Sequence, residues 1–188
     1  MFRFLTLIAA LPIVAAFVAR WWFGLKILSS NGRHQSRCDL EKWSKTFGAE
    51  NLPPSNEGDA RIFAELLRKT ALTDWSVRDP KAAASRESTR RFGMAVPPFS
   101  LMIAVLAILV GKIPVTGAIA IFLLAIAFAV IIAYLGIAPE LKAILITSRR
   151  LRDSHIFPRR DDEDAVIQSA TALVWKEAAP PIFNLIQR

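Results

Sequence analysis

Residues 96–138 read VPPFSLMIAVLAILVGKIPVTGAIAIFLLAIAFAVIIAYLGIA, and this stretch decides the fold. It holds two apolar runs, 96–115 and 117–138, in which Lys112 is the single charged residue. A helix rises about 1.5 Å per residue, so about 20 apolar residues cross a hydrocarbon core of about 30 Å. Backbone inside lipid must satisfy its own hydrogen bonds, and continuous apolar runs without period-two alternation do not form a barrel. The stretch therefore predicts a transmembrane helical hairpin.

Proline and glycine set the predicted limits of this hairpin. Pro97 and Pro98 open the first run, where the missing N–H donor of proline costs least. Residues 111–117 begin and end with glycine and contain Pro114, a composition typical of a chain reversal. So short a turn places the two helices antiparallel and adjacent. The second span is expected to end at 136–140, where a proline and a carboxylate follow the apolar run.

The overall composition agrees with a membrane protein. Apolar residues make up 53% of the 188 residues, and the formal net charge is +8. The basic residues cluster at the ends of apolar runs, which the positive-inside rule explains without a nucleic-acid partner. Cys38 is the single cysteine, so the chain forms no internal disulfide and offers no thiolate cluster for zinc. We expect no cofactor, and the expected partners are the lipid bilayer and another protein.

A third apolar run occupies residues 4–25 and is interrupted by a single arginine. It is either an uncleaved transmembrane anchor or a secretory signal, for which residues 14–16 offer a small-residue cleavage site. Apolar residues continue past that site into a tryptophan-rich belt, and tryptophan favours the headgroup level of a membrane. We therefore favour an anchor over residues 1–28. The candidate headgroup contacts in it are Arg20, whose stem can extend to the phosphates, and Trp21 and Trp22.

The distribution of Lys and Arg predicts the orientation of the three spans. Basic residues flank the segment 29–93 at both ends and follow the hairpin, whereas the hairpin tip carries only Lys112. With the N-terminus outside, 29–93 and 140–188 both lie in the cytoplasm beside a bacterial inner membrane. A cleaved first run would place 29–93 outside, against its basic flank. The further candidate contacts with lipid headgroups are Arg86, Arg90, Arg91, Arg149 and Arg150.

One cytoplasmic helix carries a face that predicts a packing or docking surface. Residues 52–58 are predicted to form a linker, and Asp59 can then cap a helix that runs to about Leu72. Spacings of three and four place its apolar residues on one face, which either packs on another helix or lies on the membrane surface. Its mixed charge favours packing. The candidate partner contacts are Ile62, Phe63, Leu66 and Leu67 on this face, together with Ile182 and Phe183 in the apolar C-terminal tail.

Two further helix starts follow from capping signals. Asp79-Pro80 combines an acidic cap with proline in the first turn, and this helix is expected to end at Gly93, just before the membrane. After the hairpin, 141–151 is expected to continue as a helix into the cytoplasm. The acidic run 161–164 precedes a helical pattern, and we interpret it as a helix start rather than a calcium or magnesium site, because a hard-cation loop needs alternating oxygen ligands and a glycine turn.

Motifs that carry chemistry were not found in the chain. It contains no HExxH, no glycine-rich phosphate loop and no GxSxG. His34 and His155 both lie in polar, basic stretches, and two histidines without a placed carboxylate do not define a zinc site. Cys38 has no base beside it in the sequence, so we interpret it as an ordinary thiol. We therefore predict no catalytic, metal-binding or cofactor-binding residue.

The C-terminal third resembles the bacterial membrane zinc metallopeptidases of the YugP type in its layout. The elements that are similar are a hairpin followed by Ala138-Pro139-Glu140, the basic stretch 148–150, the acidic helix start 161–164 and the Ala-rich stretch 170–179. The zinc-binding HExxH helix of that family has no counterpart here, so no catalytic residue can be transferred. The resemblance implies a degenerate or associated relative without the reaction.

These observations predict an all-α integral membrane protein with three transmembrane helices and short cytoplasmic helices. Its expected function is that of a non-enzymatic accessory subunit whose cytoplasmic helices bind a partner protein. The first alternative is an oligomeric pore or membrane-disrupting hairpin, and the second is the degenerate metallopeptidase relative. The oligomeric state is left open. The predicted domains are the anchor 1–28, a cytoplasmic helical segment 29–93, the hairpin 94–139 and a cytoplasmic helical tail 140–188.

Overall fold

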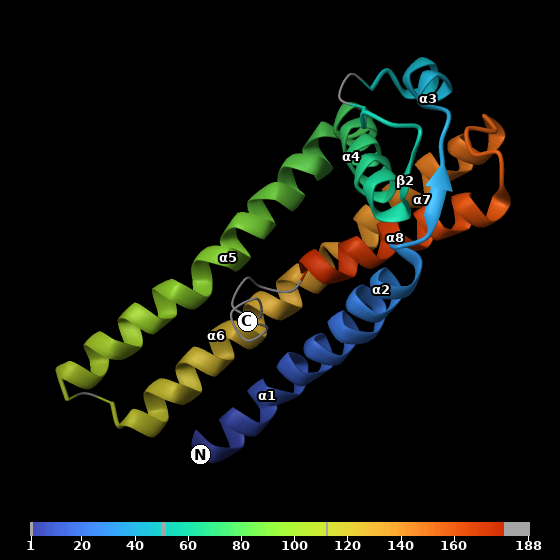
Figure 1. The fold of residues 1–188 in the computed structure, drawn as a ribbon. Coiled ribbons are helices and arrows are strands. Elements are labelled where there is room, and N and C mark those ends of the chain that lie inside the picture. Colours follow the sequence, from blue (N-terminus) through green and yellow to red (C-terminus); the bar gives the residue numbers. More distant parts are fainter. Residues whose placement is uncertain (1, 50–51, 112, 179–188) are drawn as a thin grey trace. The chain divides into compact units, whose positions relative to one another are not determined.

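The computed structural model describes residues 2–49, 52–111 and 113–178. The chain is mainly helical and divides into two compact units (Figure 1). Among the described residues, unit 1 contains 2–19, 85–111, 113–136 and 178, and unit 2 contains 20–49, 52–84 and 137–177. The described parts of each unit are considered separately below.

Within the described residues, three helices are long and apolar enough to cross a membrane. They cover Phe4–Asn31, Pro80–Leu109 and Val115–Asp153. Large apolar side chains along them are exposed, among them Leu11, Leu109 and Leu135. Long helices with apolar side chains on their outer faces are typical of membrane-spanning segments. The prediction of three candidate spans in a helical protein is confirmed.

In unit 1, helix α1 (Phe2–Ala19) packs along α6 (Val115–Leu135), as Figure 1 shows. The centre of this contact is formed by Ala16, Ile126 and Val130, which are buried. The hydroxyl of Tyr134 donates a hydrogen bond of 2.9 Å to the carbonyl oxygen of Ala16. A polar tip on an otherwise apolar interface fixes the position of one helix along the other.

The hairpin is present, but its first helix is longer than the sequence predicted. Helix α5 (Pro80–Leu109) continues through Gly93 and through Pro97-Pro98, and a turn with Gly111 at φ 69° leads to α6. The prediction that a helix ends at Gly93 is therefore wrong. Glycine ends a helix when it adopts a left-handed conformation, whereas apolar residues on both sides of Gly93 favour an unbroken backbone ladder. The start at Asp79-Pro80 is confirmed, because the amide of Ala82 donates to the Asp79 carboxylate at 3.1 Å.

The second span likewise continues past its predicted end. Helix α7 (Ile137–Asp153) follows α6 after the single residue Gly136, so that Pro139 lies within the first turn of α7. Proline is tolerated there because the first amides of a helix have no intrahelical partner. Both elements were predicted as helix, and the expected break at 136–140 is reduced to one residue.

Unit 2 contains helices and a small antiparallel sheet that the sequence analysis missed. After the π-helical segment η1 (Arg20–Lys26) come α2 (Ile27–Asn31), β1 (Gln35–Arg37), α3 (Leu40–Phe47), β2 (Glu57–Asp59), α4 (Ala60–Arg78), α7 and α8 (Arg160–Ala178). Strand β1 pairs with β2 with Ser36 opposite Gly58. Strands of three residues are too short to show alternation in the sequence. The helical class is confirmed apart from these two short strands, and the predicted linker 52–58 ends in the second of them.

The core of unit 2 forms around α4, which packs on α7. The aromatic rings of Phe63 and Trp43 both meet Phe157 edge to face, with ring centroids 6.2 Å and 6.3 Å apart. Aromatic pairs favour this geometry because the positive edge of one ring faces the negative face of the other. Trp43 and Phe47 lie together on α3, with centroids 5.4 Å apart. The acidic run 161–164 begins α8, as predicted.

Candidate functional site

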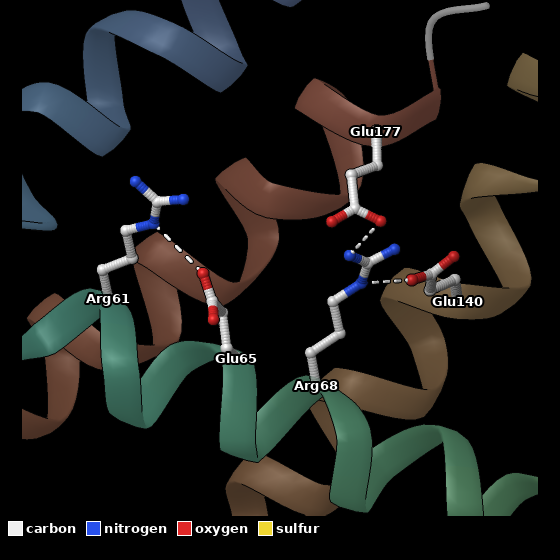
Figure 2. Close-up of polar contacts among 5 residues, drawn as sticks. All are labelled: Arg61, Glu65, Arg68, Glu140 and Glu177. Carbon is white, nitrogen blue, oxygen red and sulfur yellow. Dashed lines mark hydrogen bonds and ion pairs between the residues drawn. The ribbon is translucent and has the colours of Figure 1, made fainter. Parts of the chain in front are cut away.

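A buried arginine in unit 2 lies between two carboxylates. Arg68 projects from α4, and its Nε donates to Glu140 Oε1 at 2.6 Å while its Nη1 lies 2.6 Å from Glu177 Oε2 (Figure 2). The side chains of Arg68 and Glu140 are 11% and 5% exposed, whereas that of Glu177 is 44% exposed. The three residues come from α4, α7 and α8, so that one guanidinium joins three helices.

Two opposing effects act on the pKa of Arg68. Burial lowers the pKa of the guanidinium, but the charges of Glu140 and Glu177 and their hydrogen bonds outweigh burial and raise the pKa above its ordinary value. Arg68 therefore remains a cation at any physiological pH. The neighbouring pair Arg61–Glu65, one turn earlier on α4 in Figure 2, is exposed on both sides and contributes little by comparison.

A second buried carboxylate holds the start of α8 against β1. Asp162 lies 2.8 Å from His34 Nε2 through Oδ1 and accepts a hydrogen bond of 3.2 Å from the backbone amide of Arg37 through Oδ2. The side chain of Asp162 is buried and that of His34 is partly exposed. Arg152, at the end of α7, pairs with Glu163 in the same first turn of α8. The acidic run thus connects elements of unit 2, in addition to opening a helix.

The two histidines and the cysteine show no arrangement for a metal or a nucleophile. Among the described residues, no group of three or more His, Cys, Asp or Glu side chains is placed to hold a metal ion. Burial, followed by the negative charge of Asp39, raises the pKa of the Cys38 thiol to about 12. A thiol with so high a pKa is protonated and unreactive at neutral pH.

The candidate partner contacts separate into one exposed residue and a buried group. Ile62 is 48% exposed, whereas Phe63, Leu66 and Leu67 are buried in unit 2. The apolar face of α4 therefore packs inside unit 2, which is the first of the two alternatives given for it. Ile182 and Phe183 lie outside the described residues. Of the apolar candidates on α4, Ile62 is thus the one that is available to a partner.

The candidate headgroup contacts are mostly exposed, with one exception. Arg20 is 3% exposed, and its contact with the headgroups stays a prediction. Its position within a π-helical turn, where the side-chain directions differ from those of an α-helix, was not visible in the sequence. Trp21 and Trp22 are exposed. The remaining candidates Arg90, Arg91, Arg149 and Arg150 are exposed and Arg86 is partly exposed.

The sequence analysis missed the residues that join η1 to α8. The ring of Phe23 packs against that of Trp175, with centroids 5.1 Å apart and the planes tilted by 30°. Gly24 is buried against the backbone of Lys176, where an added Cβ would lie 3.1 Å from the Lys176 Cα. The sequence offered one indication of this contact, because a glycine within an apolar helix, here Gly24, often marks a close approach of another backbone.

Comparison of the chain with models of known protein families, with curated proteins and with solved structures gave no match. The resemblance to the YugP-type metallopeptidases therefore stays a prediction.

Proposed function

We propose that this chain is a non-enzymatic, multi-pass protein of the bacterial inner membrane, an accessory subunit that uses the helices of unit 2 to bind another protein. One observation carries the topology in this proposal. Residues 20–84 and 137–177 fold into one unit, although the hairpin separates them in the sequence. Because a folded unit lies on one side of a membrane, the hairpin must cross an even number of times.

The charge distribution supports a cytoplasmic location for unit 2. Lys26, Arg149 and Arg150 border the apolar helices on the side of this unit, and the hairpin tip carries Lys112 as its only basic residue. The positive-inside rule then places unit 2 in the cytoplasm and the tip outside. The first span ends at unit 2, so one crossing separates the N-terminus from this unit and the N-terminus also lies outside.

Surface cysteines test this topology. Thr46→Cys and Arg149→Cys place thiols on exposed positions of unit 2, and Val110→Cys places one at the exposed tip. The native Cys38 is buried and gives a low background. In intact spheroplasts, a membrane-impermeant maleimide should label Val110→Cys only, and the other two after lysis. Labelling of Thr46→Cys and Arg149→Cys from opposite sides would overturn the even crossing.

The partner surface is expected around Ile62, since Phe63, Leu66 and Leu67 hold the unit together. The wild-type protein in mild detergent should elute as a complex with a stoichiometric second protein, as measured by light scattering and mass spectrometry. Ile62→Asp should release the partner, whereas Val77→Asp, at another exposed position of α4, should retain it. A homo-oligomer without a second protein would favour the pore alternative, and a monomer would end the accessory-subunit proposal.

A further inference from the structure

Strand β2 has one edge that pairs with β1 and a second edge that is open. Among the described residues the sheet has two strands, so no further strand lies beside β2. The residue that follows β2 shows which backbone groups face β1, because the amide of Ala60 donates to the carbonyl of His34 at 2.8 Å. In an antiparallel pair, alternate residues turn their backbone groups toward the partner strand. Asp59 and Glu57 therefore turn their N–H and C=O groups to the open edge.

Two of these four backbone groups already have a partner within the chain. The amide of Glu57 donates to Ser55 Oγ at 3.1 Å. Asp59 is the N-cap of α4, and the carbonyl of an N-cap residue accepts the first hydrogen bond of its helix. In the part of the chain that the structure describes, the C=O of Glu57 and the N–H of Asp59 have no hydrogen-bond partner. The open edge thus offers one acceptor and one donor, on either side of Gly58.

This acceptor and this donor match a single residue of a parallel strand. In parallel pairing, one residue donates its N–H to a carbonyl of the neighbouring strand, and its own carbonyl accepts from the amide two residues further along that strand. The C=O of Glu57 and the N–H of Asp59 have this spacing. An antiparallel strand would need both groups of Glu57 or both groups of Asp59, and one group of each is already bonded. The free groups therefore favour a parallel strand with one residue opposite Gly58.

The exposed side chain of Ile62 lies on the face of the sheet to which such a residue would point. An added Cβ at Gly58 would lie 3.5 Å from Ile62 Cδ1. Residues opposite each other on neighbouring strands direct their side chains to the same face, so the residue opposite Gly58 would point toward Ile62. Ile62 is 48% exposed, and an apolar side chain placed there would remove it from water. The open edge of β2 and Ile62 therefore form one surface.

The outer edge of β1 is occupied by another part of unit 2. The amide of Arg37 donates to Asp162 Oδ2 at 3.2 Å, and Asp162 belongs to the first turn of α8. A buried carboxylate thus takes the position that an incoming strand would need on that side. The open edge of a sheet is a template for another extended chain, and in this sheet the available edge is that of β2.

We propose that the open edge of β2 binds an extended segment of the partner protein, which adds a parallel strand to the sheet and places an apolar side chain against Ile62. Addition of a strand gives affinity through main-chain hydrogen bonds and specificity through the side chains that contact the neighbouring surface. The inference rests on the proposed function, because it assigns the way in which the partner proposed above binds. It requires the backbone N–H of Asp59 in addition to the side chain of Ile62.

Two substitutions at one position test the role of this N–H. Asp59 has a φ of −61°, close to the value that proline imposes, so Asp59→Pro removes the N–H and keeps the backbone conformation. The matched control Asp59→Ala removes the same carboxylate and keeps the N–H. In a dilution series of the complex purified in mild detergent, Asp59→Pro should bind the second protein at least about tenfold more weakly than Asp59→Ala, since one hydrogen bond contributes about this factor.

Hydrogen exchange tests the same contact in the wild-type protein. The amide of Asp59 should exchange at least about tenfold more slowly in the purified complex than in the full chain made alone by cell-free synthesis in the same detergent, because a hydrogen-bonded amide is protected. Mass spectrometry with fragmentation of the peptide that contains Asp59 measures this rate. The measurement decides the question if Asp59→Pro melts well below Asp59→Ala.

The outcomes separate this inference from the function on which it rests. If Ile62→Asp releases the second protein while Asp59→Pro and Asp59→Ala bind it equally well, the inference is wrong and the proposed function stands. An Asp59 amide that exchanges equally fast in both samples would also overturn the added strand. A wild-type chain that elutes without a second protein, as a monomer or as a homo-oligomer, would overturn both proposals.

Discussion

Replacing Arg68 with methionine removes a buried cation and leaves two carboxylates in place. Glu140 then keeps a charge at a position that is 5% exposed, without the 2.6 Å hydrogen bond that compensates its burial. Glu177 is 44% exposed and is solvated by water when its partner is lost. The destabilisation should therefore come mainly from the unpaired buried charge of Glu140, and the loss of the ion pair with Glu177 should add little.

The expected magnitude follows from the burial of the pair. Removing one partner of a buried ion pair costs about 3–5 kcal/mol, and a loss of 1 kcal/mol lowers the melting temperature of a chain of this size by about 2–4 °C. Arg68→Met should therefore lower the melting temperature by roughly 6–20 °C. The measurement is thermal unfolding of the purified protein in detergent, followed by intrinsic tryptophan fluorescence.

Two further variants determine whether the reasoning is correct. Arg61→Met breaks the exposed pair with Glu65 on the same helix and should cost less than about 1 kcal/mol. The double variant Arg68→Met/Glu140→Leu removes both buried charges and should recover most of the stability, because an apolar replacement of a buried pair is often neutral. Equal effects of Arg68→Met and Arg61→Met, or a double variant less stable than Arg68→Met, would refute the assignment.

Three other predictions follow from single residues. Burial raises the pKa of Cys38 to about 12, so the folded state holds a proton that the unfolded thiol releases near pH 9. The free energy of unfolding of the wild type should therefore fall as the pH rises above about 9, and this fall should be absent in Cys38→Ala. Urea unfolding from pH 7 to 10.5 measures the difference. Gly24→Ala brings a methyl group against the Lys176 backbone and should lower stability by about 1–3 kcal/mol, with no loss if the contact is absent. Asp39→Ala removes the cap whose carboxylate accepts from the Lys42 amide at 3.0 Å and should cost about 1 kcal/mol, whereas the exposed control Thr46→Ala should not.

The sequence predicts those features that depend on neighbouring residues. The hairpin and the starts of α5 and α8 were found because apolar runs, prolines and acidic caps act within one or two turns. The predicted helix end at Gly93 was wrong because glycine can adopt the left-handed conformation that ends a helix but can equally adopt the helical conformation. The apolar face of α4 was found from its spacing, but whether Ile62 or Phe63 faces solvent depends on which helices pack against it.

The buried polar contacts could not be predicted for a different reason. Arg68 and Glu140 are 72 positions apart, and His34 and Asp162 are 128 apart. Local periodicity carries no information on such pairs, because many charged residues have the same sequence surroundings. The one sign of a buried ion pair in the sequence was that Arg68 directly follows Leu67 on the apolar face of α4. A charged residue beside such a face needs a partner of opposite charge once another helix packs on the face.

The hairpin divides unit 2 in the sequence, so the proposed topology connects the folding of this unit to membrane insertion. The aromatic core needs Phe63 from before the hairpin and Phe157 from after it, and Arg68 meets its carboxylates only once α7 and α8 are in place. Until then, α4 exposes an apolar face with a cation at its edge, and such a face favours aggregation or premature binding. In the topology proposed above, both segments must reach the same side of the membrane before they can pack. A hairpin that inserts as one body meets this requirement, whereas a hairpin with a single crossing would separate Phe63 from Phe157 and leave unit 2 without a core.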